Sequence, residues 1–283
     1  MKKILSLMIV LLLTVAAPNT FAQDITTTVA GIKFEAGRCL VNGKGLVIEL
    51  TATNQTSQEL GFRVNYNIDG HGSVATDAKG NDYGLWHLYA GNNEACCTCD
   101  RIALPQGIKV KFLAFLKEVP EGTTLLRQFA MDGKITKNGD ENGQKVILKG
   151  IPVQPLQNSD MPGVVCTLAE TGIKTKQPVR NGNNVEINFM LTMQSDNDII
   201  IFDDTRLRAD FRDFTILDSE GNAYEAEMVK GNNSYLEVGL PVLFTLQIKN
   251  VPEKVKRFSL IRAEFESRQG YKVEWKGVSV KTE

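Results

Sequence analysis

Two copies of one alternating pattern constrain the fold of this chain more than any other feature of its sequence. The stretch LVIELTATNQT (46–56) aligns with VEINFMLTMQS (185–195), and apolar residues recur at every second position in both. Four more pairs of stretches follow in the same order with nearly the same spacing: DAKGNDY (77–83) and DSEGNAY (218–224), GNN (91–93) and GNN (231–233), VKFLAFLKEVP (110–120) and VLFTLQIKNVP (242–252), KGIPV (149–153) and KGVSV (276–280). Self-similarity over a domain-sized period predicts a tandem duplication.

The alternation predicts β-strands that bury one face. Leu46, Ile48 and Leu50 fall on one side of the first copy, and Val185 and Ile187 fall on the same side of the second. Successive side chains of a strand point to opposite faces of a sheet, so a period of two indicates a half-buried strand. The Asp-x-x-Gly-Asn segments between extended runs favour hairpin turns. With no amphipathic helical pattern, we expect an all-β fold of two antiparallel β-sandwich domains.

A short polar segment separates the two copies. The stretch QPLQNSDMPG (154–163) is rich in turn-forming residues and lacks periodicity. We therefore expect one sandwich over residues 24–153, a linker over 154–160 and a second sandwich over 161–283.

The repeated motifs resemble a known group of domains. A strand of alternating hydrophobics, then D-x-x-G-N-x-Y, L-x-x-G and a strand ending in V-P, is similar to immunoglobulin-like domains of unknown function in exported bacterial proteins. The matching residues are Asp77, Gly80, Asn81, Tyr83, Leu104, Gly107, Val119 and Pro120, and then Asp218, Gly221, Asn222, Tyr224, Leu236, Gly239, Val251 and Pro252. The resemblance implies two tandem immunoglobulin-like domains in an accessory protein of the envelope, and it implies no catalytic residue.

The N-terminus predicts export. Lys2 and Lys3 precede an apolar run, and Thr20-Phe21-Ala22 offers a small-residue cleavage site, so residues 1–22 are interpreted as a signal peptide. No later stretch is apolar enough for a membrane span. We expect a periplasmic, cell-surface or secreted protein. The net charge of −1 gives no electrostatic reason to expect nucleic acid as a partner, and nothing indicates the oligomeric state.

Three of the five cysteines lie in EACCTCD (94–100), and the repeat shows that this stretch is an insertion. Asn93 and Leu104 are 11 positions apart, whereas Asn233 and Leu236 are 3 apart, so the first copy carries 8 extra residues. Export favours disulfides. The candidates are Cys39, Cys96, Cys97, Cys99 and Cys166, with Cys39 as the natural partner of one clustered cysteine and Cys166 as the spare or interdomain thiol.

A metal-binding or redox-active site is the alternative interpretation of the cluster. Cys96, Cys97 and Cys99 together with His87 could supply four ligands for zinc or copper(I). The spacing is not that of paired C-x-x-C motifs, and no thioredoxin-like pattern accompanies it. No motif for a catalytic residue or a bound cofactor occurs either, so we expect a protein that is not an enzyme and has no metal or cofactor.

An aromatic run directly precedes the insertion. YGLWHLYAGNN (83–93) contains Tyr83, Trp86, His87 and Tyr89, and the second copy has no aromatic residue after Tyr224 at this place. Tyrosine and tryptophan are enriched at recognition surfaces. The sequence therefore predicts a non-catalytic binding or assembly protein that recognises a protein or glycan partner through these four residues of its first domain.

Overall fold

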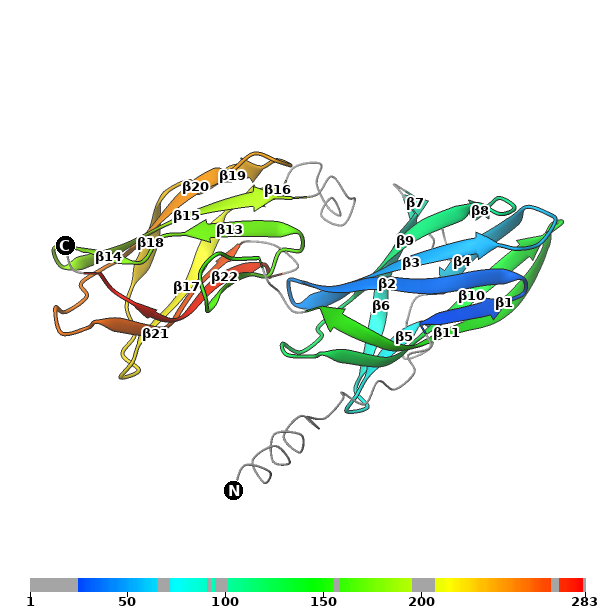
Figure 1. The fold of residues 1–283 in the computed structure, drawn as a ribbon, viewed down its shortest axis with the longest axis horizontal. Helices are drawn as coiled ribbons and strands as arrows, with labels where there is room; N and C mark the ends of the chain where they lie inside the picture. The colour runs from blue at the N-terminus through cyan, green and yellow to red at the C-terminus, as the bar shows by residue number, and fades with distance from the viewer. Residues whose placement is uncertain are drawn as a thin grey trace, which may run out of the picture.

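The chain is an elongated all-β molecule whose two halves lie end to end (Figure 1). The computed structural model describes residues 25–65, 72–90, 93–94, 101–154, 158–194, 207–265 and 270–281. Strands and turns make up these ranges, which contain no helix and hence none that could cross a membrane. The all-β prediction is confirmed. The predicted signal peptide and Cys96, Cys97 and Cys99 lie outside the described residues.

The first half, residues 25–154, is a continuous hydrogen-bonded sheet. Its strands are β1 (Thr26–Val29), β2 (Ile32–Asn42), β3 (Gly45–Asn54), β4 (Leu60–Asn65), β5 (Val74–Asp77), β6 (Asp82–Ala90), β7 (Asn93–Glu94), β8 (Ile102–Leu104), β9 (Lys109–Leu116), β10 (Leu125–Lys137) and β11 (Asp140–Gln154). The order β2-β3-β9-β6-β5-β10-β11 closes into a ring, because β11 pairs in parallel with β2 at Val153–Cys39 and Gln154–Leu40.

The second half, residues 158–281, has two separate sheets instead of a ring. Its strands are β12 (Val164–Cys166), β13 (Thr171–Thr175), β14 (Val179–Asn181), β15 (Asn184–Met193), β16 (Leu207–Ala209), β17 (Phe211–Asp218), β18 (Ala226–Lys230), β19 (Ser234–Leu236), β20 (Val242–Ile248), β21 (Arg257–Phe265) and β22 (Lys272–Ser279). One sheet runs β12-β22-β21-β17 and the other β13-β15-β20-β18, with β14 beside β15 and a small β16–β19 pair.

Two equal sandwiches therefore do not describe the molecule. Among the described residues of the second half, the backbone pairing between the edges of the two sheets consists of single bridges, Val179–Lys281 and Leu217–Ala223. At the equivalent places of the first half, two or more successive residues pair: β11 with β2, and β5 with β6. The prediction of two separate sandwiches is wrong in this respect for the first half, where a two-residue parallel pairing is enough to close the ladder.

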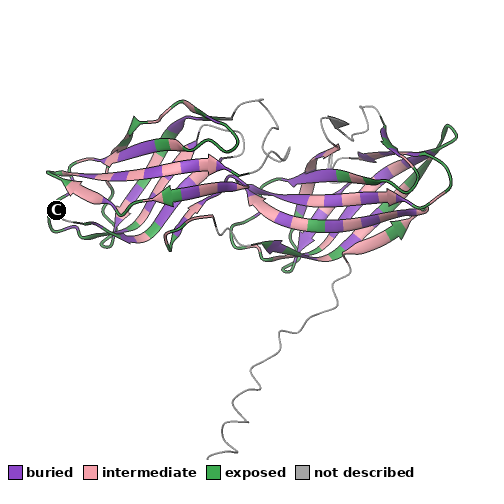
Figure 2. Ribbon diagram, turned by 45° about the horizontal axis from the view of Figure 1, so that its top comes forward, coloured by how far each residue is buried: buried purple, intermediate pink, exposed green. Residues whose placement is uncertain are grey.

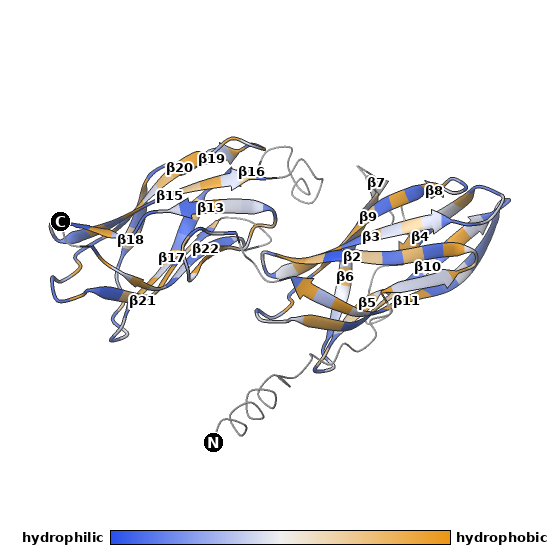
Figure 3. Ribbon diagram, in the orientation of Figure 1, coloured by the Kyte–Doolittle hydropathy of each residue, from blue (hydrophilic) through white to orange (hydrophobic). Residues whose placement is uncertain are grey.

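Burial follows the alternation that the sequence predicts. Leu46, Ile48 and Leu50 of β3 lie in the core of the first half, and the alternate residues of β15 are buried in the second. Buried and less buried residues alternate along all of β15 and along β3 from Ile48 onward, whereas the first four residues of β3 are all buried (Figure 2). Hydropathy alternates along the same strands (Figure 3). Each strand is thus held by apolar contacts on one face.

Strand pairing keeps the same register at the positions that align in the sequence. Leu46 pairs with Leu116, and Val185 pairs with Ile248. The equivalence extends to three more matched pairs: Asn54–Gln106 with Met193–Val238, Leu126–Ile151 with Phe258–Val278, and Leu40–Gln154 with Val179–Lys281. The two halves therefore share one pattern of strand connections, although one is closed and the other open.

The Asp-x-x-Gly-Asn-x-Tyr turns form the same hydrogen-bond network in both halves. Asp218 accepts the backbone N–H groups of Glu220 and Asn222 at 2.8 and 2.9 Å, and its second oxygen accepts the Tyr224 hydroxyl at 2.7 Å. Asp77 and Tyr83 form the equivalent bond at 2.8 Å. Burial opposes the charge of Asp218, but the hydrogen bonds from Asn222 and Tyr224 outweigh it and lower its pKa to about 2.

The end of the predicted linker is fixed to the second half. Asn158 donates through Nδ2 to the carbonyl of Cys166 at 2.6 Å and accepts the Cys166 N–H at 3.2 Å. Its own carbonyl accepts the N–H of Ile173 at 2.6 Å. Residues from 158 onward therefore pack as part of the second half.

Candidate binding surface

The aromatic run lies on β6, where a bulge changes the alternation of its side chains. Leu85 and Leu88 are both buried in the first-half core although three positions separate them. The pairing with β9 shifts register between Leu85 and His87, and this extra residue accounts for the spacing. Trp86, His87 and Tyr89 are consequently half-buried, outside the core of the first half.

Tyr83 lies apart from the other three residues of the aromatic run. It is buried at 7% exposure, and its hydroxyl donates to Asp77. Burial, followed by the hydrogen bond to the Asp77 carboxylate, raises the pKa of Tyr83. Tyr224 makes the same contact with Asp218 in the second half, so Tyr83 has a structural role in its turn, and its predicted role in binding stays a prediction.

The other three rings form a continuous row. The ring centres of Trp86 and His87 are 4.6 Å apart, and those of His87 and Tyr89 are 5.5 Å apart. Lys117, at the end of β9, places its Nζ 4.3 Å from the centre of the Trp86 ring. A cation at this distance from the face of an indole is attracted by the ring. We call Trp86, His87 and Tyr89 the aromatic row.

One end of the aromatic row leads to the junction between the halves. Tyr89 packs edge-on against Phe115 with ring centres 6.3 Å apart. Phe115, Leu113 and Val47 are outward residues of the first half, yet they are nearly fully buried within the hydrophobic cluster of the second half. Tyr89 also packs against that cluster, so its ring contributes to the junction as well as to the row.

Polar contacts reinforce this junction at the hairpin between β2 and β3. The N–H of Gly43 donates to the carbonyl of Thr167 at 2.8 Å, and Asn42 Oδ1 accepts the N–H of Ala169 at 3.4 Å. Arg38 lies 2.6 Å from Glu49 in its own half and 2.7 Å from Glu170 in the other. Hydrogen bonding to Glu49 raises the pKa of Arg38, so this cation remains charged at any physiological pH.

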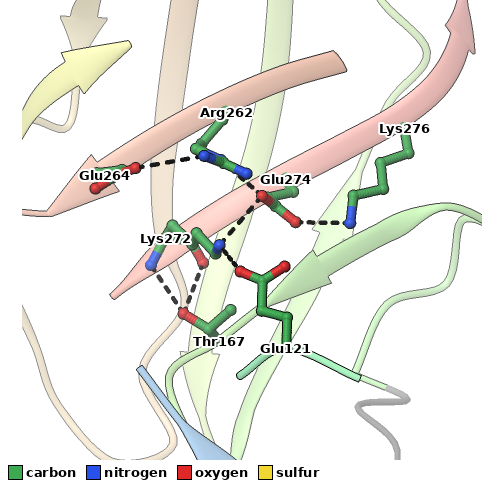
Figure 4. A network of polar contacts seen from close by, with 7 residues as sticks. All are labelled: Glu121, Thr167, Arg262, Glu264, Lys272, Glu274 and Lys276. Atoms are coloured by element: carbon green, nitrogen blue, oxygen red, sulfur yellow. Dashed lines mark hydrogen bonds and ion pairs between the residues drawn. The ribbon is translucent and has the colours of Figure 1, made fainter. Parts of the chain in front are cut away.

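A second set of ion pairs crosses the junction at the start of β22 (Figure 4). Glu274 is 1% exposed and lies among three cations: Arg262 at 2.7 Å, Lys276 at 3.0 Å and Lys272 at 3.4 Å. Lys272 also pairs with Glu121 of the first half. Burial opposes the charge of Glu274, but hydrogen bonds from Lys276 and Arg262 outweigh it and lower its pKa.

The sequence contained a signal for these junction residues that alternation alone does not identify. Val47, Leu113 and Phe115 are apolar at outward positions, whereas their counterparts in the second half are Glu186, Thr245 and Gln247. There the polar residues bond to one another or to neighbours, with Gln247 donating to Glu186 at 3.3 Å. At these three positions, an apolar residue that occurs in the first copy alone lies at the contact between the halves.

The two described cysteines are buried free thiols. Cys39 lies in the first-half core and Cys166 in the second-half core, both at 0% exposure. Burial raises the pKa of each to about 12. The predicted bridge from Cys39 stays a prediction, because its candidate partners Cys96, Cys97 and Cys99 lie outside the described residues. In the described ranges no three histidine, cysteine or acidic side chains gather as metal ligands, and the inserted cysteines are outside them.

Fold and surface together define an all-β chain of two packed halves with an aromatic row on one of them. No family model matches the sequence, and no curated protein matches it. Similar solved structures include a conserved domain protein from Bacillus anthracis, at 9% identity and a TM-score of 0.26, covering 87% of this chain and 78% of that one.

Two further structures show similarity at the same level. A protein of unknown function from Porphyromonas gingivalis W83 has 9% identity and a TM-score of 0.23, covering 89% of this chain and 99% of that one. The exo-chitosanase CsxA of Amycolatopsis orientalis has 12% identity and a TM-score of 0.24, covering 85% of this chain but 26% of the enzyme. These values assign neither a family nor an activity to the chain.

Proposed function

We propose that the chain is an exported, non-catalytic binding or assembly protein of the bacterial envelope, built by duplication of an immunoglobulin-like domain. Residues 1–22 act as its signal peptide, and the two copies correspond to residues 24–153 and 161–283. The matched strand registers and the matched Asp77 and Asp218 turns support the duplication.

The partner is a protein or a glycan that contacts the aromatic row. One observation carries this proposal: three successive half-buried rings, Trp86, His87 and Tyr89, lie outside the core with centres 4.6 and 5.5 Å apart. The corresponding strand of the second half, β18, has no aromatic residue. Aromatic rings of this kind provide large contact areas at low entropic cost and are frequent at the centre of recognition sites.

Trp86→Ala is the variant that tests the row, since Trp86 lies away from the junction cluster that Tyr89 contacts. Ile108→Ala is the matched control, because Ile108 is 56% exposed on the same half at a distant turn. A glycan array tests one class of partner, and photo-crosslinking from position 87 in intact cells tests the other.

We expect Trp86→Ala to lose at least about tenfold in affinity or crosslinking yield, and Ile108→Ala to retain both. Binding by Trp86→Ala that equals the wild type in both assays would remove the aromatic row from the proposal.

A further inference from the structure

A second interaction surface lies on the other half of the molecule, away from the aromatic row. Six large hydrophobic residues of the described chain are more than a third exposed, and five of them fall within one stretch of the second half. We call these five the apolar patch: Val229, Tyr235, Val238, Leu240 and Leu243, which are 39–56% exposed.

The fold itself does not require these side chains to be apolar. The first half builds the same turn and strands with Ala103 at the position of Tyr235, Gln106 at that of Val238 and Lys111 at that of Leu243. Val229 and Leu240 have the hydrophobic counterparts Tyr89 and Ile108, so the difference between the halves lies at the other three positions. Exposed apolar patches of several hundred Å² are uncommon on soluble proteins and mark sites of association.

Strand β18 provides an open sheet edge beside this patch. It stands at the end of the order β13-β15-β20-β18, and among the described strands only β20 pairs with it. In the first half, by contrast, β7 pairs with the equivalent strand β6 at Tyr89 and Ala90. The second half lacks the insertion, which begins at the second residue of β7, and no described strand pairs with β18 at the equivalent place.

The direction of the free backbone groups follows from the hydrogen bonds on the other side of β18. Lys249 donates its N–H to the carbonyl of Glu225 at 2.8 Å, and Glu227 pairs with Gln247 two residues further along. Bonding alternates along an antiparallel strand. The N–H and C=O groups of Ala226 and Met228 therefore point away from β20, and Val229 turns its side chain to solvent on the same strand.

We propose that β18 accepts an extended segment of a partner protein as an added strand, with alternate apolar side chains of that segment resting on Val229 and Leu243. An unpaired edge next to an apolar face is recognised in this way, since main-chain bonds give affinity and alternate side chains give selectivity. The surface is separate from the aromatic row, and the proposal does not depend on it.

The size of the surface favours a short segment over a second copy of the chain. Five side chains at about half exposure present on the order of 400 Å², a typical size for the largest functional patch of a monomer. A stable dimer buries about 800 Å² on each partner. The β18 edge is 5 residues long and carries a bulge between Met228 and Lys230, so it can pair with a short segment only.

The test uses the full chain and a displayed library of random short peptides as the probe. We expect selected peptides to share alternating apolar residues, and one synthetic peptide of this kind to slow amide exchange at Ala226 and Met228. Two variants interrupt the surface by different means. Ala226→Pro removes an N–H that points away from β20 and leaves the existing ladder intact, and Val229→Lys places a charge on the apolar face.

Both variants are expected to weaken peptide binding at least about tenfold, whereas Ile108→Lys, the control at the counterpart of Leu240, binds as the wild type does. Circular dichroism identifies a variant that fails to fold, and the other variant then decides. Peptides without an alternating consensus, or binding that resists both substitutions, overturn the proposal. A dimer of the free chain that Val229→Lys dissociates also overturns it, because the occupant would then be a second copy.

Discussion

The junction between the halves offers a direct test of the fold, and Phe115→Gln is the sharpest perturbation. Phe115 is 4% exposed and contacts the hydrophobic cluster of the second half, although it lies on an outward position of β9. The counterpart on β20 is Gln247, so the substitution gives the first half the residue that the second half carries at this place.

The expected loss follows from the burial of the ring. Truncation of a buried phenylalanine costs roughly 3–5 kcal/mol. Glutamine retains part of the volume but buries an amide, whose desolvation costs about 1–3 kcal/mol when it finds no partner. We therefore expect Phe115→Gln to lower the free energy of unfolding by about 3 kcal/mol. The reciprocal change Gln247→Phe is the matched control, expected to stay within about 0.5 kcal/mol, since Gln247 is only half-buried and outside the hydrophobic cluster.

Urea unfolding followed by tryptophan fluorescence separates the two halves. The chain has 2 tryptophans: Trp86 on the first half and Trp275, which is 0% exposed in the core of the second. Phe115→Gln in a Trp86→Phe background reports on the second half alone, and its midpoint should fall because the junction stabilises that half. A loss below about 1 kcal/mol, or an equal loss for Gln247→Phe, would refute the assignment of Phe115 to a packed junction.

Three further predictions concern the turn networks and the thiols. Asp218→Asn should lower the stability of the fold at neutral pH and flatten the decline of stability between about pH 5 and pH 2, as urea titrations at each pH would show. The folded pKa of Asp218, about 2, lies below the unfolded value of about 3.9. The charged carboxylate therefore stabilises the fold above pH 4, and this stabilisation is lost as the pH falls. Tyr83→Phe and Tyr224→Phe should each lower the free energy of unfolding by about 1–2 kcal/mol in thermal or urea unfolding. A Tyr83→Phe variant that loses about tenfold in binding affinity but unfolds like the wild type would contradict the structural role of Tyr83. Cys39 and Cys166 should resist alkylation in the folded chain and react once urea unfolds it, as mass mapping of the two peptides would reveal; labelling of either in the native chain would oppose the buried positions.

Alternation was sufficient to predict the strands but not how the sheets close. The inward set of Leu46, Ile48 and Leu50 follows from the period of two, because that face forms the core of the first half. The closing pairs Val153–Cys39 and Gln154–Leu40 lie at the very end of β11, and their formation depends on how far the sheets curve. Curvature arises from twist and bulges summed over many strands, which no short stretch of sequence encodes.

The surroundings of the aromatic residues followed less directly from the sequence, for a related reason. An aromatic residue satisfies the patterns for core, turn and surface equally well, and Tyr83, Trp86 and Tyr89 turned out to have different surroundings. The repeated Asp-x-x-Gly-Asn-x-Tyr motif already placed Tyr83 with Tyr224, so the second copy was the better guide for that residue. The bulge after Leu85 interrupts the alternation of side chains, so a period of two does not predict which face of the sheet Trp86 and Tyr89 occupy.

Inward and outward positions of the two halves carry different information about this molecule. Inward positions agree in kind, as Ile48 and Ile187 do, because both halves bury the same strands in the same register. Outward positions differ between the halves in three regions. At the junction the first half has Phe115 where the second has Gln247, and at the apolar patch it has Lys111 where the second has Leu243. The aromatic row on β6 has no aromatic counterpart on β18. A shared fold cannot account for differences at positions that the fold leaves free. The first difference accounts for the contact between the halves, since Val47, Leu113 and Phe115 of the first half pack into the hydrophobic cluster of the second, whereas Gln247 bonds to Glu186 on its own half. The positions at which the two halves no longer match are therefore the ones whose side chains the shared strand pattern does not explain.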